Sequence, residues 1–469
     1  MHDFVSLLPL IIVGSGAILL MLLAAYGKIE VKLAALISMA FYAAAFFVQL
    51  IAGCGPETVL FPHIFNGMLV SSNFTMAACL VIFGCGFFTS MTGHSYFNIN
   101  RFCTVEFYSV MMFSVCGMVL LSMAQELITA FIALEIMSLA IYILVGYDRN
   151  SLTASEAIFK YLMLGAFAGA FFTMGSALIY GGVGSTKFAE IGLYIGANSA
   201  GTPLLIGGVF LVFVALLFKA AAFPFHAWVI DVYDGASAPV TGFMATALKT
   251  ATFAIFANFI SLSGGLHGEW INFLFWVAVL TMFGGNLVAI GQSNIKRMLA
   301  ASGIVHSGYL LIALVAISTE QFTGSVIGYY LAAYAVGTLG MFAALSYLGG
   351  EGEKRINFDD FKGLAKVRPY SAAAIAVFLL SMAGIPPTAG FMGKFYVITS
   401  AISAGQMALA VLGVVSSILS MWYYLRLIIN MYFHEADDSF EIEGSPLATA
   451  STFVLVICVF AIGLYPIVI

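Results

Sequence analysis

The chain has 469 residues, of which 62% are hydrophobic and only 8% are charged, and its formal net charge is −5. Soluble domains carry about 25% charged residues, so this composition, with a mean hydropathy of +1.06, excludes a soluble globular protein. It predicts an all-α polytopic membrane protein in contact with membrane lipid. With so few charged residues the net charge says little about partners, and we expect no nucleic-acid partner.

Apolar stretches long enough to cross a bilayer as helices, which takes about 20 residues each, occur fourteen times along the chain. The first contains no basic leader and exceeds the length of a signal-peptide core, so we expect it to be retained as a helix. The expected spans are approximately 5–26, 31–52, 68–91, 104–123, 125–146, 157–181, 203–229, 239–263, 270–291, 298–317, 324–348, 371–403, 406–433 and 446–468.

Lysine and arginine are distributed unevenly between the two sides of these spans. Twelve of the seventeen fall in loops that share one side, whereas only Lys187 falls in a loop on the other. Because basic loops remain in the cytoplasm, we expect the inner (cytoplasmic) membrane as the location and both termini on the outward, periplasmic side. The twelve are Lys28, Lys32, Arg101, Arg149, Lys160, Lys296, Arg297, Lys354, Arg355, Lys362, Lys366 and Arg368.

Four ionisable residues lie well inside the spans: Glu135 in the fifth, Lys219 in the seventh, Lys249 in the eighth and Lys394 in the twelfth. An unpaired charge at the centre of a membrane helix costs roughly 2.5–3.5 kcal/mol, so these groups must be paired, hydrated or neutralised. One interpretation is a static bridge between Glu135 and one lysine. The other is a row of lysines along a hydrated axis, which also accounts for the two lysines left without an acidic partner.

Lysine is suited to such an axis because a buried lysine can lose its proton, whereas arginine remains charged. A carboxylate about 6 Å away favours the charged amine by roughly 3 kcal/mol at an effective dielectric constant near 20. A change in the position or charge of Glu135 relative to Lys219 would therefore load or unload a proton on the next lysine.

Proline residues interrupt two of the spans that carry lysine. Pro224 follows Lys219 in the seventh span, and Pro386 and Pro387 precede Lys394 in the twelfth. These spans are an odd number apart and point in opposite directions, which predicts two inverted five-helix repeats, spans 4–8 and 9–13, with broken helices 7 and 12. The expected organisation is a single membrane domain, 1–469, with three N-terminal helices in 1–103, repeats in 104–263 and 270–433, and a last helix in 446–469.

Two histidines are candidates for proton transfer. His306 lies three residues before Tyr309 and therefore shares its helix face, and His226 follows the break in the seventh span. Either residue would relay protons or, alternatively, make a hydrogen bond between helices. Glu106 lies near the end of a span, where we expect a solvated or gateway role.

The sequence contains no motif for redox chemistry or metal binding. Its six cysteines form no C-x-x-C pair, no Gly-rich phosphate loop follows a strand, and H-E-x-x-H does not occur. We therefore expect no metal, no cofactor and no redox centre on this chain.

Four ordered segments, 135–171, 226–251, 294–311 (NIKRMLAASGIVHSGYLL) and 383–396 (AGIPPTAGFMGKFY), resemble the antiporter-like subunits of respiratory complex I, the NADH-quinone oxidoreductase. The resemblance implies fourteen helices with two inverted repeats and proton translocation driven by quinone reduction elsewhere in the complex. It further implies that Glu135 is the coupling glutamate, Lys219 its partner, Lys249 the central carrier and Lys394 the terminal residue near the outward exit. NADH, FMN, iron–sulfur clusters and quinone would bind partner subunits, and neighbouring antiporter-like subunits would be contacts.

Departures from the family pattern are local. Ile230 before Asp231, Ser237 and Ala140 stand where proline is frequent, which is expected to loosen turns without removing an ionisable group. Asp231, like His226, Tyr309 and Glu106, is a candidate accessory residue.

The sequence therefore predicts a proton-translocating membrane subunit of a complex I-type oxidoreductase. Alternatives are the large subunit of a multi-subunit cation/proton antiporter, or a subunit of a complex I relative fed by ferredoxin or another reduced cofactor. A scaffold with static ion pairs is an interpretation of a different class.

Overall fold

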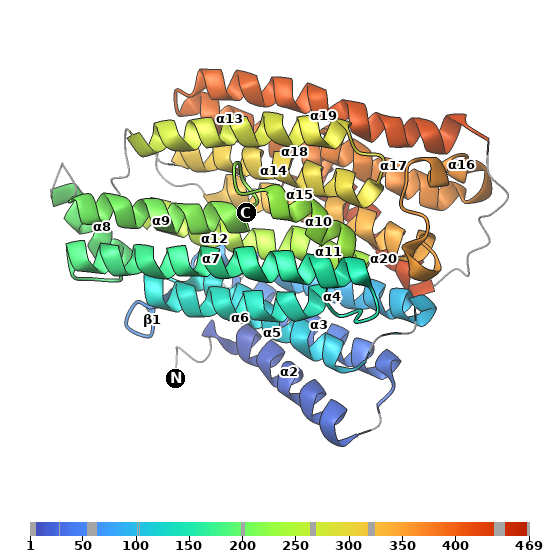
Figure 1. Cartoon of the computed structure of the whole chain (residues 1–469), viewed down its shortest axis with the longest axis horizontal. Coiled ribbons are helices and arrows are strands. Elements are labelled where there is room, and N and C mark those ends of the chain that lie inside the picture. The colour runs from blue at the N-terminus through green and yellow to red at the C-terminus, as the bar shows by residue number, and fades with distance from the viewer. Residues whose placement is uncertain are drawn as a thin grey trace.

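The computed structural model describes residues 6–27, 29–53, 63–100, 102, 104–197, 202–262, 269–317, 324–435 and 446–466. Lys28 and Arg101, two of the basic residues expected on one side, lie outside them. The helices run roughly side by side in one bundle (Figure 1), in agreement with the predicted all-α class.

Twelve helical runs in the described residues are long and apolar enough to cross a membrane. They are α2 (Leu8–Tyr26), α3 (Val31–Gly53), α4 (Asn73–Asn100), α5 (Glu106–Met123), α6 (Leu127–Val145), α7 (Leu152–Val183), the continuous run of α11 (Ala238–Phe243), the π-helix η1 (Met244–Leu248) and α12 (Lys249–Leu262), then α13 (Glu269–Ile290), α14 (Ile295–Ile317), α15 (Gly324–Leu348), α19 (Met407–Phe433) and α20 (Pro446–Leu464).

The seventh and twelfth expected spans are each broken into two helices. The first pair is α9 (Pro203–Lys219) and α10 (Ala227–Gly235), and the second is α17 (Pro369–Ala383) and α18 (Ala389–Ser403). Pro224 lies in the first break, and Pro386 and Pro387 lie in the second, because proline cannot donate the backbone hydrogen bond that continues a helix. The twelve continuous runs and the two broken pairs occupy the positions of the expected spans, whereas the inverted relationship between the two groups stays a prediction.

Short elements connect these helices. They are the antiparallel strands β1 (His63–Ile64) and β2 (Leu69–Val70), the helix α8 (Phe188–Ala197), the 3₁₀ helices η2 (Glu351–Glu353) and η3 (Asp359–Phe361), and α16 (Leu364–Val367).

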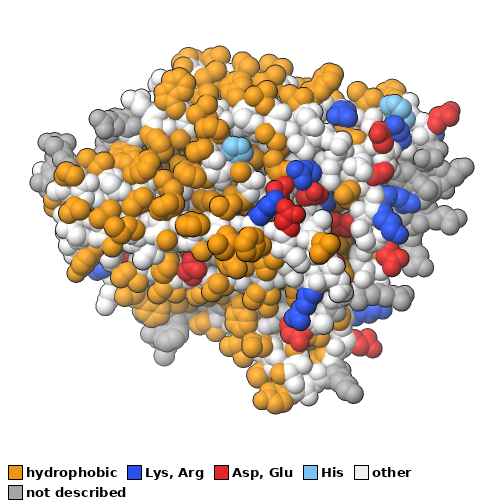
Figure 2. All heavy atoms as spheres, in the orientation of Figure 1, with side chains coloured by type: hydrophobic (Ala, Val, Ile, Leu, Met, Phe, Trp, Pro, Cys, Tyr) orange, Lys and Arg blue, Asp and Glu red, His pale blue; other side chains and the backbone are white. Residues whose placement is uncertain are grey.

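Burial separates central from peripheral helices. In the most apolar windows of α14 and α15, 94% and 89% of residues are buried, against 28% in α2 and 33% in α7. The outward faces of the peripheral helices are apolar, and orange side chains cover most of the visible face in Figure 2. An apolar surface of this extent is expected to contact lipid or other membrane subunits.

Charged side chains gather toward one end of the bundle, on the right in Figure 2. We call this the basic end; it comprises the start of α7, the link between α10 and α11, the start of α14 and residues 349–368. The prediction that all twelve basic residues lie in loops is wrong for five of them. Four lie at the starts of long helices, because helical hydrogen bonding extends past the apolar window into the polar ends, and the fifth lies in the short helix α16. These residues are Lys32, Lys160, Lys296, Arg297 and Lys366.

Candidate functional site

Three lysines from different helices lie inside the bundle rather than on its surface. Lys219 is the last residue of α9, Lys249 the first of α12, and Lys394 lies in α18 just past the second break. Their exposed fractions are 2%, 3% and 5%. Among the described residues, no ion pair includes any of them or Glu135, so the interpretation as a static Glu135–lysine bridge is wrong for this structure.

Lys219 is held by hydroxyl and aromatic groups. Its Nζ donates to Ser138 Oγ at 2.8 Å and lies 3.5 Å from Tyr142 OH. It also lies 5.5 and 5.4 Å from the ring centroids of Tyr142 and Tyr161. Glu135 precedes Ser138 by three residues on α6 and therefore lies on the same helix face. Its carboxylate is thus on the side of α6 that faces Lys219.

Removal of the Ser138 hydroxyl tests how strongly this contact holds the amine. Ser138→Ala leaves Lys219 with the weak Tyr142 contact, and an unsatisfied buried donor costs about 1–3 kcal/mol. We expect a lower thermal midpoint of the purified protein in detergent. Ser90→Ala is the matched control, because Ser90 Oγ donates only to Gly86 O within its own helix; an equal loss in both variants would contradict the special role of Ser138.

Lys249 directly follows the π-helix η1, and such local widenings of a helix are frequent at functional sites. Its Nζ donates to the Gly303 carbonyl at 2.5 Å and lies 5.1 Å from the ring centroid of Tyr334. A Cβ on residue 303 would stand 3.2 Å from Tyr334 OH and 3.4 Å from Lys249 Nζ. Glycine at this position therefore permits the close approach of α14 to the amine.

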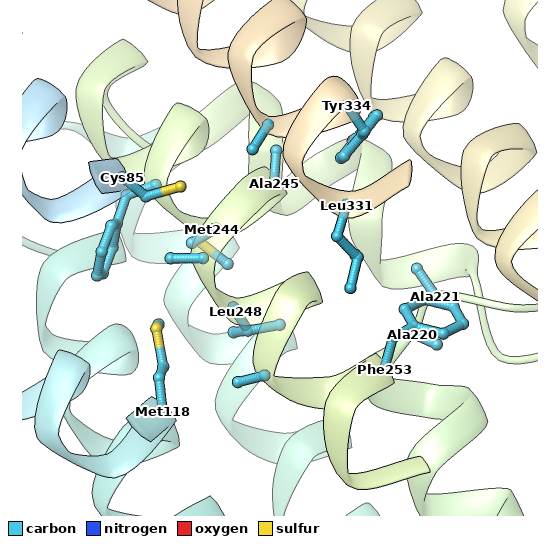
Figure 3. Close-up of a cluster of buried hydrophobic side chains, with 14 of the residues drawn as sticks. Cys85, Met118, Ala220, Ala221, Met244, Ala245, Leu248, Phe253, Leu331 and Tyr334 are labelled. Carbon is cyan, nitrogen blue, oxygen red and sulfur yellow. The ribbon is translucent and has the colours of Figure 1, made fainter. Parts of the chain in front are cut away.

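The contacts between Lys219 and Lys249 are sparse. Ser307 Oγ donates to the Ala220 carbonyl at 2.5 Å and approaches the Gly303 carbonyl at 3.2 Å, which joins the residue after Lys219 to the acceptor of Lys249. The surroundings are apolar: Figure 3 shows Ala220, Leu248 and the neighbouring hydrophobic side chains packed around η1. One hydroxyl is thus the direct polar link that the structure describes between these two lysines.

The region between Lys249 and Lys394 is much more polar, with His306 at its centre. The His306 Nδ1 and Nε2 atoms lie 2.7 Å from Tyr330 OH and 3.3 Å from Tyr424 OH, and its ring packs 4.7 Å from that of Tyr334. Tyr424 OH in turn hydrogen-bonds Ser302 Oγ. We call His306, Tyr330, Tyr334 and Tyr424 the histidine cluster.

A small cavity of about 10 Å³ adjoins the histidine cluster and is lined by His306, Tyr330 and Tyr334 together with residues of α15, α17 and α18. This is about the smallest volume that holds one water molecule, and the lining offers polar partners for it. The cluster therefore provides a hydroxyl, an imidazole and room for a single water in contact with one another.

Lys394 lies at the far end of the cluster, against the second break. Its Nζ donates to the Ala383 carbonyl and to Ser417 Oγ, both at 2.9 Å, and lies 5.1 Å from the ring centroid of Tyr309. The carbonyl of Ala383 is free for this bond because α17 ends there, with Gly384 in a left-handed conformation at φ +86°. The break thus supplies the acceptor for a buried amine.

The candidate accessory residues occupy different places. Tyr309 lies next to one of the three buried lysines: its ring is beside the Lys394 amine, and its hydroxyl donates to the Gly413 carbonyl at 3.1 Å. His226 is the residue directly before α10, at the first break; it stacks on Phe223, and its buried Nδ1 has no hydrogen-bond partner among the described residues.

The two accessory carboxylates lie away from the three buried lysines, Lys219, Lys249 and Lys394. Asp231 pairs with Lys160 at 2.7 Å and with Arg297 at 3.3 Å at the basic end. Glu106 is an exposed residue in the first turn of α5.

Sequence reasoning missed most of the partners that hold the amines. The i, i+4 spacing of Tyr330 and Tyr334 was a usable signal, since it places both on one helix face. The Ser302–Tyr424 contact joins residues 122 positions apart, for which the sequence offers no signal. The missed residues are Ser138, Ser302, Gly303, Ser307, Tyr330, Tyr334, Ser417 and Tyr424.

Buried amines held by neutral oxygen atoms, two broken helices and a histidine-centred polar interior define a polytopic membrane protein of the ion-translocating type. Residues 124–420 match the family described as "NADH:quinone oxidoreductase/Mrp antiporter, TM". The chain therefore belongs to this family, in the branch of subunit N of NADH-quinone oxidoreductase, as the following relatives show.

NADH-quinone oxidoreductase subunit N 1 of Sorangium cellulosum is 37% identical over 99% of this chain and 96% of its own length. Subunit N of Trichlorobacter lovleyi is 42% identical over 72% of this chain and 69% of its own. A chain in the structure of respiratory complex I from Thermus thermophilus with bound aureothin superposes with a TM-score of 0.83 at 30% identity, covering 98% of this chain and 97% of that one. The resemblance drawn from four motifs is thereby confirmed.

Proposed function

We propose that this chain is the proton-translocating membrane subunit of a complex I-type NADH:quinone oxidoreductase. Protons would move along Glu135, Lys219, Lys249, His306 and Lys394, coupled to quinone reduction in other subunits. The observation that carries the proposal is the histidine cluster, which lies between Lys249, beside the ring of Tyr334, and Lys394, beside the ring of Tyr309, in the interior of a chain whose relatives are subunit N.

The acceptors of the three amines support this role. Lys219, Lys249 and Lys394 each donate to neutral oxygen atoms, a hydroxyl or a backbone carbonyl. A neutral amine still has hydrogens to donate to such oxygens, so the contacts tolerate both protonation states. An ion pair with a carboxylate would instead fix the charged form.

The transfer steps follow the geometry. A change in the position or charge of Glu135 alters the electrostatic environment of Lys219 and, through it, the proton affinity of Lys249. A proton from Lys249 passes by way of Tyr334, His306 and the adjoining water-sized cavity toward Lys394. Histidine suits the middle position because its ring can accept a proton at one nitrogen and donate from the other. Tyr309 would assist at Lys394, and His226, Asp231 and Glu106 would act only at the edges of the route.

The wider setting is part of the proposal. The basic end would face the cytoplasm, both termini would face the periplasm, and the chain would lie in the inner membrane. Other membrane subunits, including neighbouring antiporter-like subunits, and lipid would cover its apolar faces. This chain would hold no cofactor, while NADH, FMN, iron–sulfur clusters and quinone would bind partner subunits.

The antiporter alternative and the relatives fed by ferredoxin or another reduced cofactor rank lower. The family description names both oxidoreductase and antiporter members, but the relatives at 37–42% identity are named as subunits of NADH-quinone oxidoreductase. Neighbouring genes for iron–sulfur and flavin subunits would decide for complex I, and small membrane subunits without redox partners for the antiporter.

Proton pumping by the complex reconstituted in vesicles, measured alongside quinone reduction, tests the proposal. We expect Lys249→Ala to lower pumping at least tenfold because it removes the central carrier, while the complex still assembles. Lys362→Ala is the control, since Lys362 pairs with Asp359 at the exposed basic end, and pumping should be unchanged. Normal pumping by an assembled Lys249→Ala complex would instead support the static scaffold.

A further inference from the structure

The carboxylate of Glu135 lies against the backbone of α7. A Cβ added at Gly169 would stand 2.9 Å from Glu135 Oε1 and 3.9 Å from its Cδ. Gly169 is buried, the glutamate is half-buried, and within the described part of the chain the carboxylate forms no ion pair. The carboxylate therefore occupies the space that a side chain at position 169 would fill.

A second glycine of α7 receives another polar group of α6. Gly165 lies one helical turn before Gly169 and on the same face of the helix. A Cβ at residue 165 would clash with Tyr142 OH, the hydroxyl that lies 3.5 Å from Lys219 Nζ. We call Gly165 and Gly169 the glycine notch. The notch holds a hydroxyl that contacts Lys219 and, one turn away, a carboxylate that forms no ion pair with it.

The helix that carries the glycine notch packs directly on the helix that ends at Lys219. Gly175 of α7 faces Gly208 of α9, and a Cβ on either residue would stand 2.7 Å from the carbonyl oxygen of the other. Two backbones packed this closely have little freedom to move past each other. The notch is therefore fixed relative to Lys219, and the place of the carboxylate on the notch sets its distance from the amine.

Glu135 acts on Lys219 across this distance. The carboxylate interacts electrostatically with the Lys219 amine and with Tyr142, while the amine donates its short hydrogen bond to Ser138 Oγ. The energy of a charge–charge interaction varies inversely with distance. A carboxylate on the notch thus influences the amine without fixing its charge, whereas direct contact would give an ion pair that favours the charged form.

We propose that Gly165 and Gly169 are positioning residues that hold Glu135 away from Lys219, so that the carboxylate influences the amine without pairing with it. The inference rests on the proposed function and deepens it. Neither glycine carries a proton; the notch sets the geometry between Glu135 and the first of the three buried lysines.

Gly169→Ala in the full complex tests the glycine notch. Outside its own helix, the added methyl group meets only the flexible end of Glu135 within 4 Å among the described residues. We therefore expect an unchanged thermal midpoint and at least a threefold loss of pumping relative to quinone reduction in reconstituted vesicles. Gly181→Ala is the matched control in α7, because an added Cβ there meets nothing within 4 Å, and it should pump normally.

A second substitution tests whether the methyl group acts through the carboxylate. Glu135→Asp shortens the side chain by one methylene group and makes room for a methyl group at residue 169. We expect the double variant Gly169→Ala, Glu135→Asp to pump at least twofold better than Gly169→Ala alone. Glu156→Asp is the control for this rescue, because it shortens an exposed carboxylate near the start of α7 and should restore nothing.

Two results would overturn the positioning role. Normal pumping by Gly169→Ala would show that the place of the carboxylate on α7 is unimportant. Loss of pumping without rescue by Glu135→Asp would show that residue 169 only packs α7 in the bundle.

The same vesicles separate this inference from the proposed function. If Lys249→Ala stops pumping while Gly169→Ala pumps normally, the glycine notch alone is wrong. If Lys249→Ala pumps normally, the proposed function itself is wrong.

Discussion

Replacement of Lys394 by arginine is expected to stop proton translocation as completely as replacement by alanine, with at least a tenfold loss in each case. Lys394 is 5% exposed and donates only to the Ala383 carbonyl and Ser417 Oγ. Arginine preserves the positive charge but does not release its proton in a protein. Comparison of the two variants therefore distinguishes a lysine that carries protons, which neither arginine nor alanine can replace, from a lysine that only supplies a fixed positive charge, which arginine can replace. Pumping relative to quinone reduction in reconstituted vesicles is the measurement.

Lys187 provides the control for this series. It is half-exposed at the end opposite the basic end and lies 3.8 Å from Glu190. Lys187→Arg and Lys187→Ala are both expected to pump normally. Recovery of pumping by Lys394→Arg, with Lys394→Ala inactive, would show that only the charge at this position matters and would contradict the role of Lys394 as a proton carrier.

Gly390→Ala is expected to destabilise the protein by about 3 kcal/mol, in the upper part of the range for overpacked sites. A Cβ at residue 390 would stand 1.8 Å from the Ser381 carbonyl oxygen, so the backbones of α17 and α18 would have to separate. The Gly390 N–H also donates to Ser381 Oγ at 3.1 Å, a contact that this separation would lengthen. We expect a lower thermal midpoint and less assembled complex in the membrane.

Gly84→Ala is the matched substitution for Gly390→Ala. Gly84 lies in α4, where an added Cβ meets nothing within 4 Å. Alanine is favoured over glycine in a helix by up to about 1 kcal/mol, so this variant should be as stable as the parent or slightly more so. Equal stability of the two variants would mean that the second break tolerates separation of its two helices.

The helices were largely predictable, because each span is a local run of apolar residues and each break contains proline. The start of α14 was predicted wrongly: the expected span began at residue 298, whereas the helix begins at Ile295. A hydropathy window rejects Lys296 and Arg297, but backbone hydrogen bonding is indifferent to their charge and continues through them. The error hid a buried lysine at the basic end.

The amines of the site were also predictable, whereas their partners were not. Lys219, Lys249 and Lys394 stand out as charges inside apolar runs, and His306 as a histidine in a span. Ser138, Tyr424 and Ser417 resemble ordinary helix residues in the sequence. Each lies 23 to 118 positions along the chain from the group that it contacts, and only the fold brings the two together. The π-helix before Lys249 carries no proline or other break signal that the sequence analysis used.

The sequence by itself determined that this protein lies in a membrane, where its helices break and which amines lie at bilayer depth, because each of these follows from local composition. Only the tertiary structure decided which buried lysine pairs with a carboxylate and which is held by neutral oxygen atoms. Lys296 meets a carboxylate 57 residues away, and Lys249 meets a carbonyl oxygen 54 residues away. The packing of distant helices, and not the residue type, sets that difference, since the charge on a buried amine depends on the groups that surround it.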